Sequence, residues 1–171
     1  MITIQKSADG VKENSLSSFA QKARKAVGLK GNVCILLTSN REMRQLNRCF
    51  RGKDKPTDVI SFPAMEAVAQ EVAGDLAISV DIAAANAKHF GHSTQEEVHV
   101  LILHGLLHLA GYDHEKDDGE MARKEQHLRA KLRLPSTLIA RANLMSKSEE
   151  KLKKSVTQTR TKRVVKARSA R

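Results

Sequence analysis

Three histidines in the segment HGLLHLAGYDH, residues 104–114, stand at a spacing that suits a metal ion. His104 and His108 lie four residues apart, so on a helix their side chains share one face, with Cβ atoms about 5–6 Å apart. Two imidazoles at this separation can reach one zinc ion through bonds of about 2.0–2.1 Å. Gly111 allows the chain to turn, so that His114 can return as a third ligand. The segment therefore predicts one zinc ion per chain, bound by His104, His108 and His114.

The number of ligands indicates what kind of zinc site this is. Structural zinc sites are closed by four protein ligands, whereas catalytic sites keep one position open for water or substrate. Three neutral imidazoles also leave the full charge of the ion uncompensated, which lowers the pKa of a bound water to about 7. Burying imidazoles in an apolar helix is costly unless something satisfies them. The three histidines therefore predict a catalytic metal site.

The residue after His104 separates two kinds of hydrolase. Zinc peptidases of the H-E-x-x-H-x-x-G-x-x-H type share this histidine and glycine spacing, but they have a glutamate base at the second position. Here that position is Gly105. The acidic side chains after His114 suit the cap and first turn of another helix better than a catalytic base. They are Glu115, Asp117, Asp118 and Glu120. Proteolysis is disfavoured, and it stays an alternative.

A phosphodiester poses a different chemical problem from an amide. Its transition state gathers negative charge on the phosphoryl oxygens, which a metal ion and an arginine together would stabilise. In RNA the adjacent 2′-hydroxyl can also serve as the nucleophile. Arg51, in the segment FRGKDKPTDVISFP (residues 50–63), is a candidate for this cation. On its position alone, a surface arginine without a catalytic role is the commoner interpretation.

The other histidines show no comparable pattern. His99 lies nine residues before His108, about half a turn round the helix, so it is expected to face away from the site. Ordinary surface or core roles are expected for His89, His92 and His127. Asp113 fits two interpretations equally: a carboxylate that orients a metal-binding histidine, or a turn residue.

The helix that would carry His104 and His108 is expected to run from Ser93 to Ala110. Ser93 and Glu96 form a capping-box pattern at its start. From Val98 onward the sequence is apolar nearly all round, which is typical of a helix buried at the centre of a domain. Gly111 is placed to end the helix in a left-handed conformation.

The remaining pattern mixes strands with helices. Strands are expected at residues 1–6, 33–38, 58–62 and 75–80. Helices are expected at about 14–27, 39–50, 81–90 and 117–133, with a last short one ending near 145. The predicted N-caps are Asn14 or Ser15, Ser39 with Glu42, Asp81, and Asp117 or Asp118. This order predicts an α+β, zincin-like domain: a mixed sheet of about four strands, packed with helices and with the metal-binding helix at its centre.

Positive charge is concentrated at the C-terminal end of the chain. The 171 residues carry a net charge of +11. Residues 146–171 hold ten Lys or Arg and two acids, whereas residues 1–145 hold twenty basic and seventeen acidic residues. We therefore expect a domain at residues 1–145 and a basic, disordered tail at 146–171. The tail is either a solvated end or an arm that binds a polyanion such as RNA, and the two interpretations are compatible.

Composition also bears on the compartment. No stretch reaches the roughly 18 apolar residues of a membrane span, and the first residues lack the pattern of a signal peptide. Cys34 and Cys49 are expected to be free, reduced and buried thiols. These features predict a cytoplasmic protein without membrane contact.

The motifs HGLLHLAGYDH, FRGKDKPTDVISFP and GDLAIS together resemble the YbeY family of endoribonucleases, the rRNA maturation factors. The resemblance covers about residues 30–133. It implies an α+β fold with a buried metal helix beside a cleft, and zinc ligation by His104, His108 and His114. It also implies that Arg51 is a catalytic or RNA-phosphate residue of that cleft. We take Arg51 and the ligand His114 as the catalytic residues.

The same resemblance implies an activity and its partners. These are cleavage of single-stranded RNA, maturation of rRNA including the 3′ end of the small-subunit RNA, and ribosome quality control. Ribosomal RNA and ribosomal particles would be the partners, with ribosomal proteins or an assembly GTPase as possible protein partners. Two alternatives stay open: a metallopeptidase, and a non-catalytic rRNA-binding assembly factor whose zinc is closed by a fourth ligand.

Overall fold

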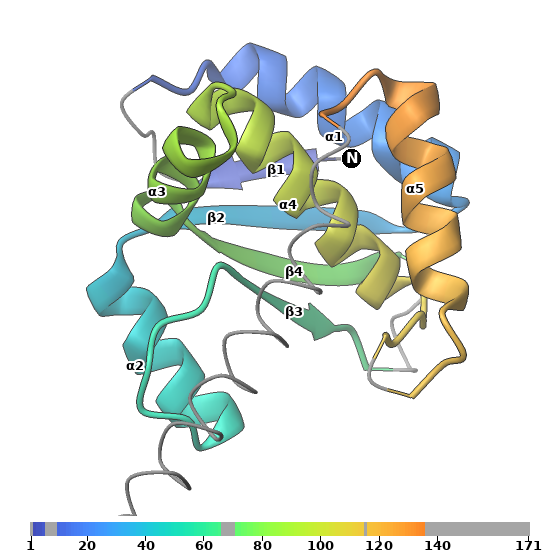
Figure 1. Cartoon of the computed structure of the whole chain (residues 1–171). Helices are drawn as coiled ribbons and strands as arrows, with labels where there is room; N and C mark the ends of the chain where they lie inside the picture. Colours follow the sequence, from blue (N-terminus) through green and yellow to red (C-terminus); the bar gives the residue numbers. More distant parts are fainter. Residues whose placement is uncertain (1, 6–9, 66–70, 115, 136–171) are drawn as a thin grey trace, which may run out of the picture. The chain divides into compact units, whose positions relative to one another are not determined.

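A mixed four-stranded sheet forms the framework of the domain (Figure 1). The computed structural model describes residues 2–5, 10–65, 71–114 and 116–135. The strands are β1 (Ile2–Gln5), β2 (Asn32–Thr38), β3 (Val59–Pro63) and β4 (Val72–Ser79). Their order across the sheet is β1-β2-β4-β3, with β3 antiparallel to β4 and the other pairs parallel. The predicted mixed sheet of four strands is confirmed.

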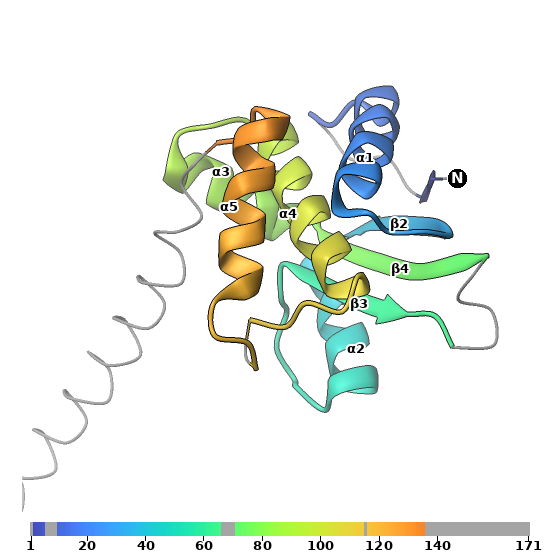
Figure 2. The same ribbon diagram turned by 90° about the vertical axis from the view of Figure 1, so that its right-hand side faces the viewer.

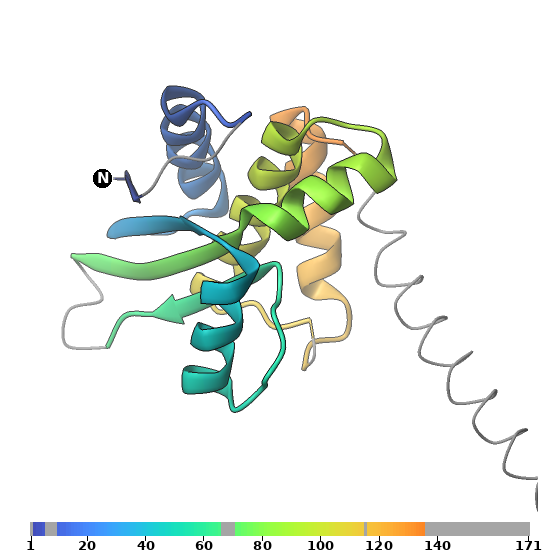
Figure 3. The same cartoon turned by 90° about the vertical axis from the view of Figure 1, so that its left-hand side faces the viewer.

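Five helices cover this sheet in the part of the chain that the structure describes. They are α1 (Glu13–Val27), α2 (Asn40–Arg51), α3 (Val80–Phe90), α4 (Thr94–Leu109) and α5 (Glu120–Leu132). Figure 3 shows α2 below the sheet and α1, α3 and α4 above it. The predicted α+β class is confirmed, with helices on both faces of one sheet.

Alternate residues of β4 divide the core between these two faces. Leu76 and Ile78 belong to the large cluster beneath α1 and α4, whereas Ala77 packs with Met43 of α2 and Ile60 of β3. Successive side chains of a strand point to opposite faces, so one strand supplies both layers. The helix α2 is therefore separated from α4 by the sheet itself.

Helix α4 lies at the centre of the domain, as predicted. It packs against α1, α3 and α5 and against strands β3 and β4. Val98, Leu101, Leu103 and Leu107 are each at most 1% exposed. Full burial of one such side chain contributes about 1.5–3 kcal/mol. The nearly continuous apolar sequence of α4 is thus explained by neighbours on almost every side.

Local capping was predicted with mixed success. Capping boxes occur at Ser39 and Ser93, as expected. The predicted caps of two other helices are wrong, because α1 begins after Lys12 and α3 after Ser79. Strand β4 runs directly into α3, so the last strand residue, Ser79, accepts the hydrogen bond from Ile82 N at 3.2 Å. The carboxylate of Asp81 instead accepts a hydrogen bond from the backbone N–H of Asn40.

Some predictions concern surfaces and the chain ends. Both cysteines are free, but only Cys34 is half-buried, so the expectation of two buried thiols is wrong for Cys49, which is exposed. No helix in the described ranges is long and apolar enough to cross a lipid bilayer. The expected helix near residue 145 and the division at 145/146 lie outside the described residues and stay predictions.

Candidate functional site

His104, His108 and His114 come together at the C-terminal end of α4. One ligand nitrogen from each ring lies within 4.8 Å of the others, so the group could hold a metal ion. The Nε2 atoms of His104 and His108 are 3.2 Å apart. Two nitrogens bound to one tetrahedral zinc ion would be about 3.3 Å apart, given bonds of about 2.0–2.1 Å. The spacing of these two rings therefore fits a zinc ion without rearrangement of α4.

The end of α4 explains how a third histidine reaches the pair. Gly111 has φ +92°, in the left-handed region. Its N–H donates to His108 O at 3.0 Å, and the N–H of Tyr112 donates to Leu107 O at 3.1 Å. These two bonds are the Schellman motif, which reverses the chain direction after a helix. The turn predicted at Gly111 is confirmed, and it brings His114 back toward the helix.

The ionisation of His108 suits a metal ligand. Burial, followed by the neighbouring rings of His104 and His114, lowers the pKa of His108 to about 4. The imidazole is therefore neutral at pH 7, and a neutral ring nitrogen is the form that binds a metal. Asp113 acts in the opposite direction on this pKa, but more weakly.

A carboxylate that the sequence did not reveal contacts His104. Glu125 of α5 has Oε2 3.1 Å from Nδ1 of His104. Of the two interpretations of Asp113, the turn residue fits better: its carbonyl accepts from Lys116 and Asp117, and its carboxylate pairs with Lys116. The sequence does contain one indication that Glu125 has a special role. It lies between Met121 and Leu128 on the buried face of α5, where a charged residue is out of place.

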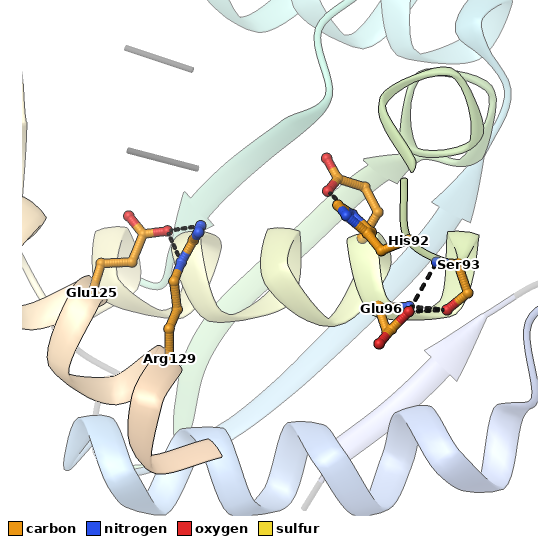
Figure 4. Close-up of polar contacts among 6 residues, drawn as sticks. His92, Ser93, Glu96, Glu125 and Arg129 are labelled. Carbon is orange, nitrogen blue, oxygen red and sulfur yellow. Dashed lines mark hydrogen bonds and ion pairs between the residues drawn. The ribbon is translucent and has the colours of Figure 1, made fainter. Parts of the chain in front are cut away.

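Glu125 is itself held by Arg129 one helical turn later (Figure 4). Nε and Nη2 of Arg129 approach Oε1 of Glu125 at 3.1 and 2.5 Å. Burial alone would raise the pKa of the Glu125 carboxyl. The hydrogen bond and the charge of His104, followed by the charge of Arg129, outweigh burial and lower this pKa to about 2. Glu125 is therefore ionised at neutral pH although little of it is exposed.

Gly105, at the position of the peptidase base, faces the sheet. A Cβ atom here would lie 2.7 Å from Cδ2 of Leu76 and 3.3 Å from Cγ2 of Val59. Its carbonyl accepts a hydrogen bond from Ser61 Oγ at 3.2 Å, which fixes α4 against β3. A glutamate side chain would therefore have to displace buried core residues. Packing against the sheet thus explains why position 105 has no glutamate. The same absence removes the general base that a zinc peptidase uses.

Arg51 ends α2, and its side chain is exposed, without an ion pair among the described residues. The helix α2 lies on the other face of the sheet from α4, which carries His104 and His108 (Figure 2). The structure brings the predicted ligands together, but it leaves the role of Arg51 a prediction.

The other histidines have ordinary roles, as expected. His99 faces away from the site and stacks on Phe19 of α1, with ring centroids 4.1 Å apart. His92 forms a buried pair with Glu97, with Nε2 and Oε2 2.9 Å apart. Exposed positions are occupied by His89 and His127. The expected helix cap at Asp117 or Asp118 is wrong, because α5 begins after Gly119. The carboxylate of Asp117 instead accepts from the N–H groups of Gly119 and Met121 in the turn before the helix.

Known proteins share this fold and sequence. The family model described as endoribonuclease YbeY matches residues 1–133. The endoribonuclease YbeY of Koribacter versatilis is 54% identical over 154 residues, covering 90% of this chain and 99% of that protein. That of Solibacter usitatus is 43% identical over 140 residues, covering 82% and 92%. The solution structure of a Thermotoga maritima protein matches with a TM-score of 0.55 and 33% identity, covering 77% and 89%. The chain therefore belongs to the YbeY family of endoribonucleases.

Proposed function

We propose that this protein is a zinc-dependent endoribonuclease that cleaves single-stranded RNA during rRNA maturation, including formation of the 3′ end of small-subunit rRNA, and during ribosome quality control. One observation supports this chemistry most. One nitrogen from each of three histidines lies within 4.8 Å of the others, and no fourth ligand joins this group among the described residues. Three protein ligands with an open position are typical of catalytic zinc sites. Family membership supports the choice of RNA as the substrate.

Each residue of the site has a proposed task. His104, His108 and His114 hold the metal ion, and His114, the exposed member, borders the solvent. Bound zinc supplies a Lewis acid that stabilises negative charge on phosphoryl oxygens. Arg51 binds a phosphate of the RNA strand. Because Arg51 has no ion pair among the described residues, its guanidinium is available for this contact.

Zinc is proposed as the native metal on the basis of its ligands. Imidazole nitrogens suit zinc, but also copper, iron and nickel. The separation of 3.2 Å between two Nε2 atoms agrees with tetrahedral geometry, which zinc adopts most readily. Elemental analysis of protein purified without added metal would test this choice. A stoichiometric metal other than zinc would contradict it.

The proposed partners follow from the substrate. Ribosomal RNA and ribosomal particles would be the targets, with ribosomal proteins or an assembly GTPase as candidates for bringing the enzyme to them. Its place of action would be the cytoplasm. The ten Lys or Arg of residues 146–171 would add sequence-independent affinity for RNA. Pull-down of ribosomal particles by the full chain would test these associations.

The central experiment is a cleavage assay with an end-labelled single-stranded rRNA fragment and defined zinc. We expect His104→Ala and Arg51→Glu to lose cleavage. Matched controls change exposed positions outside α2, His127→Ala and Lys88→Glu, and we expect them to retain it. Casein serves as the peptide substrate and should remain intact. Equal cleavage by the His104→Ala variant and the wild type would show that the activity belongs to a contaminant.

Metal removal separates this proposal from a non-catalytic assembly factor. A nuclease that depends on its ion loses cleavage in a chelator, and the activity returns when zinc is restored. An assembly factor would bind the same RNA and cleave it in neither condition. A duplex of the same sequence tests strand specificity, because a base-paired strand should resist cleavage.

A further inference from the structure

Glu125 of α5 contacts His104, and Arg129 contacts Glu125. The function proposed above uses neither residue. We propose that Glu125 and Arg129 are positioning residues, which fix the tautomer and ring orientation of His104 and keep the three-histidine site ready for its metal. The inference rests on the proposed metal-dependent function, because it assigns a task to residues that do not touch the metal themselves.

The two nitrogens of His104 point to different neighbours. Nδ1 lies 3.1 Å from Oε2 of Glu125, and Nε2 lies 3.2 Å from Nε2 of His108. The carboxylate of Glu125, which already accepts two hydrogen bonds from Arg129, serves His104 as an acceptor as well, so Nδ1 carries the proton. In the neutral ring Nε2 then keeps its lone pair, and it is directed at the point where the ligand nitrogens converge. Contact with Glu125 thus selects the tautomer that binds a metal.

Arg129 gives the carboxylate one orientation. Its Nε and Nη2 atoms both donate to Oε1 of Glu125, which leaves Oε2 directed at His104. The two residues are one turn apart on α5, and their side chains are only 4% and 13% exposed. A planar guanidinium with two N–H groups on one partner restricts rotation more than a lysine ammonium would. Glu125 therefore cannot turn away from His104 without breaking a buried ion pair.

Helix α4 carries a second histidine–glutamate pair that serves as an internal comparison. His92 and Glu97 lie at the opposite end of α4 from the metal ligands, 2.9 Å apart and almost fully buried. Figure 4 shows the two groups at opposite ends of the helix. Both pairs bury a carboxylate beside an imidazole, but only His104 belongs to the three-histidine group. Equivalent substitutions in the two pairs therefore separate a metal-related role from a purely structural one.

Zinc affinity is the first measurement, made on the full chain by competition with a chromophoric chelator. We expect Glu125→Ala to weaken zinc binding by about 10–100-fold, which is usual for loss of a carboxylate behind a metal-binding histidine. Glu125→Gln should lose less, because the amide oxygen can still accept from Nδ1. Glu97→Gln should lower stability in urea and change zinc affinity by less than about twofold. If Glu125→Ala does not fold, Glu125→Gln decides, with at least a threefold loss expected.

The second measurement is the imidazole N–H signal of His104 in ¹H–¹⁵N spectra, assigned by its disappearance in His104→Ala. A proton held on Nδ1 by a carboxylate exchanges slowly with water, so a downfield signal is expected before and after zinc is added. Glu125→Ala should remove this signal in the zinc-free protein. Glu97→Gln should leave it in place. A purely structural role for Glu125 would not predict this difference.

A double-mutant cycle tests whether Arg129 acts through Glu125. Arg129→Met should weaken zinc binding severalfold in the wild-type background. In the Glu125→Ala background the same change should have little further effect on zinc affinity, because the carboxylate through which Arg129 acts is already gone. It should also recover stability, since Glu125→Ala removes the carboxylate that faces the buried guanidinium. If Arg129→Met restores stability in this background but does not restore zinc affinity, Arg129 acts on the metal site by positioning Glu125.

The possible failures are distinguishable. If the wild-type chain binds no metal ion, the proposed function and this inference fall together. If the wild type binds zinc and cleaves RNA, but the Glu125 variants match it in zinc affinity and in the His104 signal, only this inference is overturned. Independent, additive effects of Glu125 and Arg129 on zinc affinity would overturn the part assigned to Arg129.

Discussion

The role proposed for Arg51 depends on which phosphate of the bound RNA its guanidinium contacts. Its side chain is exposed at the end of α2, on the opposite face of the sheet from α4. A contact made only in the transition state lowers kcat, whereas a contact with a distant phosphate raises KM alone. We expect Arg51→Gln to lower kcat/KM on single-stranded RNA by about 10²–10³-fold, the usual effect of losing a positioned charge donor.

The split between kcat and KM then decides what Arg51 does. Arg51→Lys keeps the charge but loses the planar pair of donors, so it should restore only part of the activity. Lys88→Gln, on α3, is the control and should leave both constants nearly unchanged. Rates equal to wild type in Arg51→Gln would remove this residue from the site. A change in KM alone would make it a substrate-binding residue rather than a catalytic one.

His99 predicts a loss of stability in mild acid. Gln95 Oε1 accepts from Lys12 N, so its amide donates to Nε2 of His99, which must be unprotonated. Burial lowers the pKa of His99 to about 4, with Glu96 opposing weakly. Above the unfolded value of about 6.5 the stabilisation is complete, and it is lost as pH falls toward 4, because the unfolded chain then binds the proton more readily. After solvent screening we expect about 1–3 kcal/mol.

Replacing His99 by a residue that cannot be protonated tests this prediction. His99→Phe keeps a ring against Phe19 but cannot be protonated. Urea unfolding of both metal-free proteins between pH 7.5 and pH 4.5 gives the difference in stability at each pH. As pH falls, the free energy of unfolding of the variant relative to the wild type should rise by about 1–3 kcal/mol. Parallel curves for the two proteins would show that His99 is not the group responsible.

Sequence patterns predicted the site residues that lie close together along the chain. They missed the contacts that only the packing of distant segments creates. The three proposed ligands lie within eleven residues, so helix geometry and one glycine turn are sufficient to bring them together. Glu125 reaches His104 only because α5 packs on α4, which no local pattern specifies. The packing of Gly105 against Leu76 likewise depends on how α4 lies on the sheet.

At the scale of elements, the close approach of α4 to the sheet sets a testable limit at Gly105. Helix propensity alone favours Gly105→Ala by about 1 kcal/mol. The added methyl group, however, would meet two methyl groups of Leu76 at 2.7 and 3.1 Å. Leu76 is 1% exposed, so it has no open space to move into. Overpacking of this kind costs about 1–3 kcal/mol, so we expect net destabilisation of up to about 2 kcal/mol.

Urea denaturation measures both effects with a matched control. Ala84→Gly, on the exposed face of α3, changes propensity without changing packing and should cost about 1 kcal/mol. Gly105→Glu should be more destabilising than Gly105→Ala, and it should not gain activity on casein. A stabilised Gly105→Ala protein would mean that the helix can shift away from β4 without cost.

The elements themselves were predictable to different degrees. Capping boxes at Ser39 and Ser93 were evident because cap and partner are three residues apart. The start of α3 was misplaced because Ser79 belongs to β4 and to the helix cap at once. The order of the strands, and the position of α2 on its own face, depend on contacts between distant segments. These could not be derived from periodicity, which reports one element at a time.

At the scale of the whole molecule, charge is distributed unevenly. Within residues 1–135, basic residues exceed acidic ones by only two. Residues 40–58, which include α2, hold six exposed Lys or Arg and three acids. This segment therefore carries the domain's excess of positive charge. An RNA strand would be attracted to it.

The basic segment at 146–171 adds a second source of attraction, and salt dependence can measure its share. Each phosphate of a single strand that the protein neutralises contributes about 0.7 to the slope of log K against log salt concentration. Comparing the full chain with a 1–145 truncation on one RNA should reveal a shallower slope for the truncation. The ten Lys or Arg of the segment set an upper limit of about 7 on that difference.

Cleavage by the truncation provides the second half of this test. The proposed metal ligands and Arg51 all lie within residues 1–145, so kcat at saturating RNA should be unchanged. KM should rise, and the increase should shrink as salt is raised, because screening weakens the contribution that the segment makes in the full chain. A substitution of the ten Lys or Arg by Gln in the full chain should reproduce the truncation if charge alone matters. Equal slopes for the full chain and the truncation would show that these residues do not contact RNA phosphates.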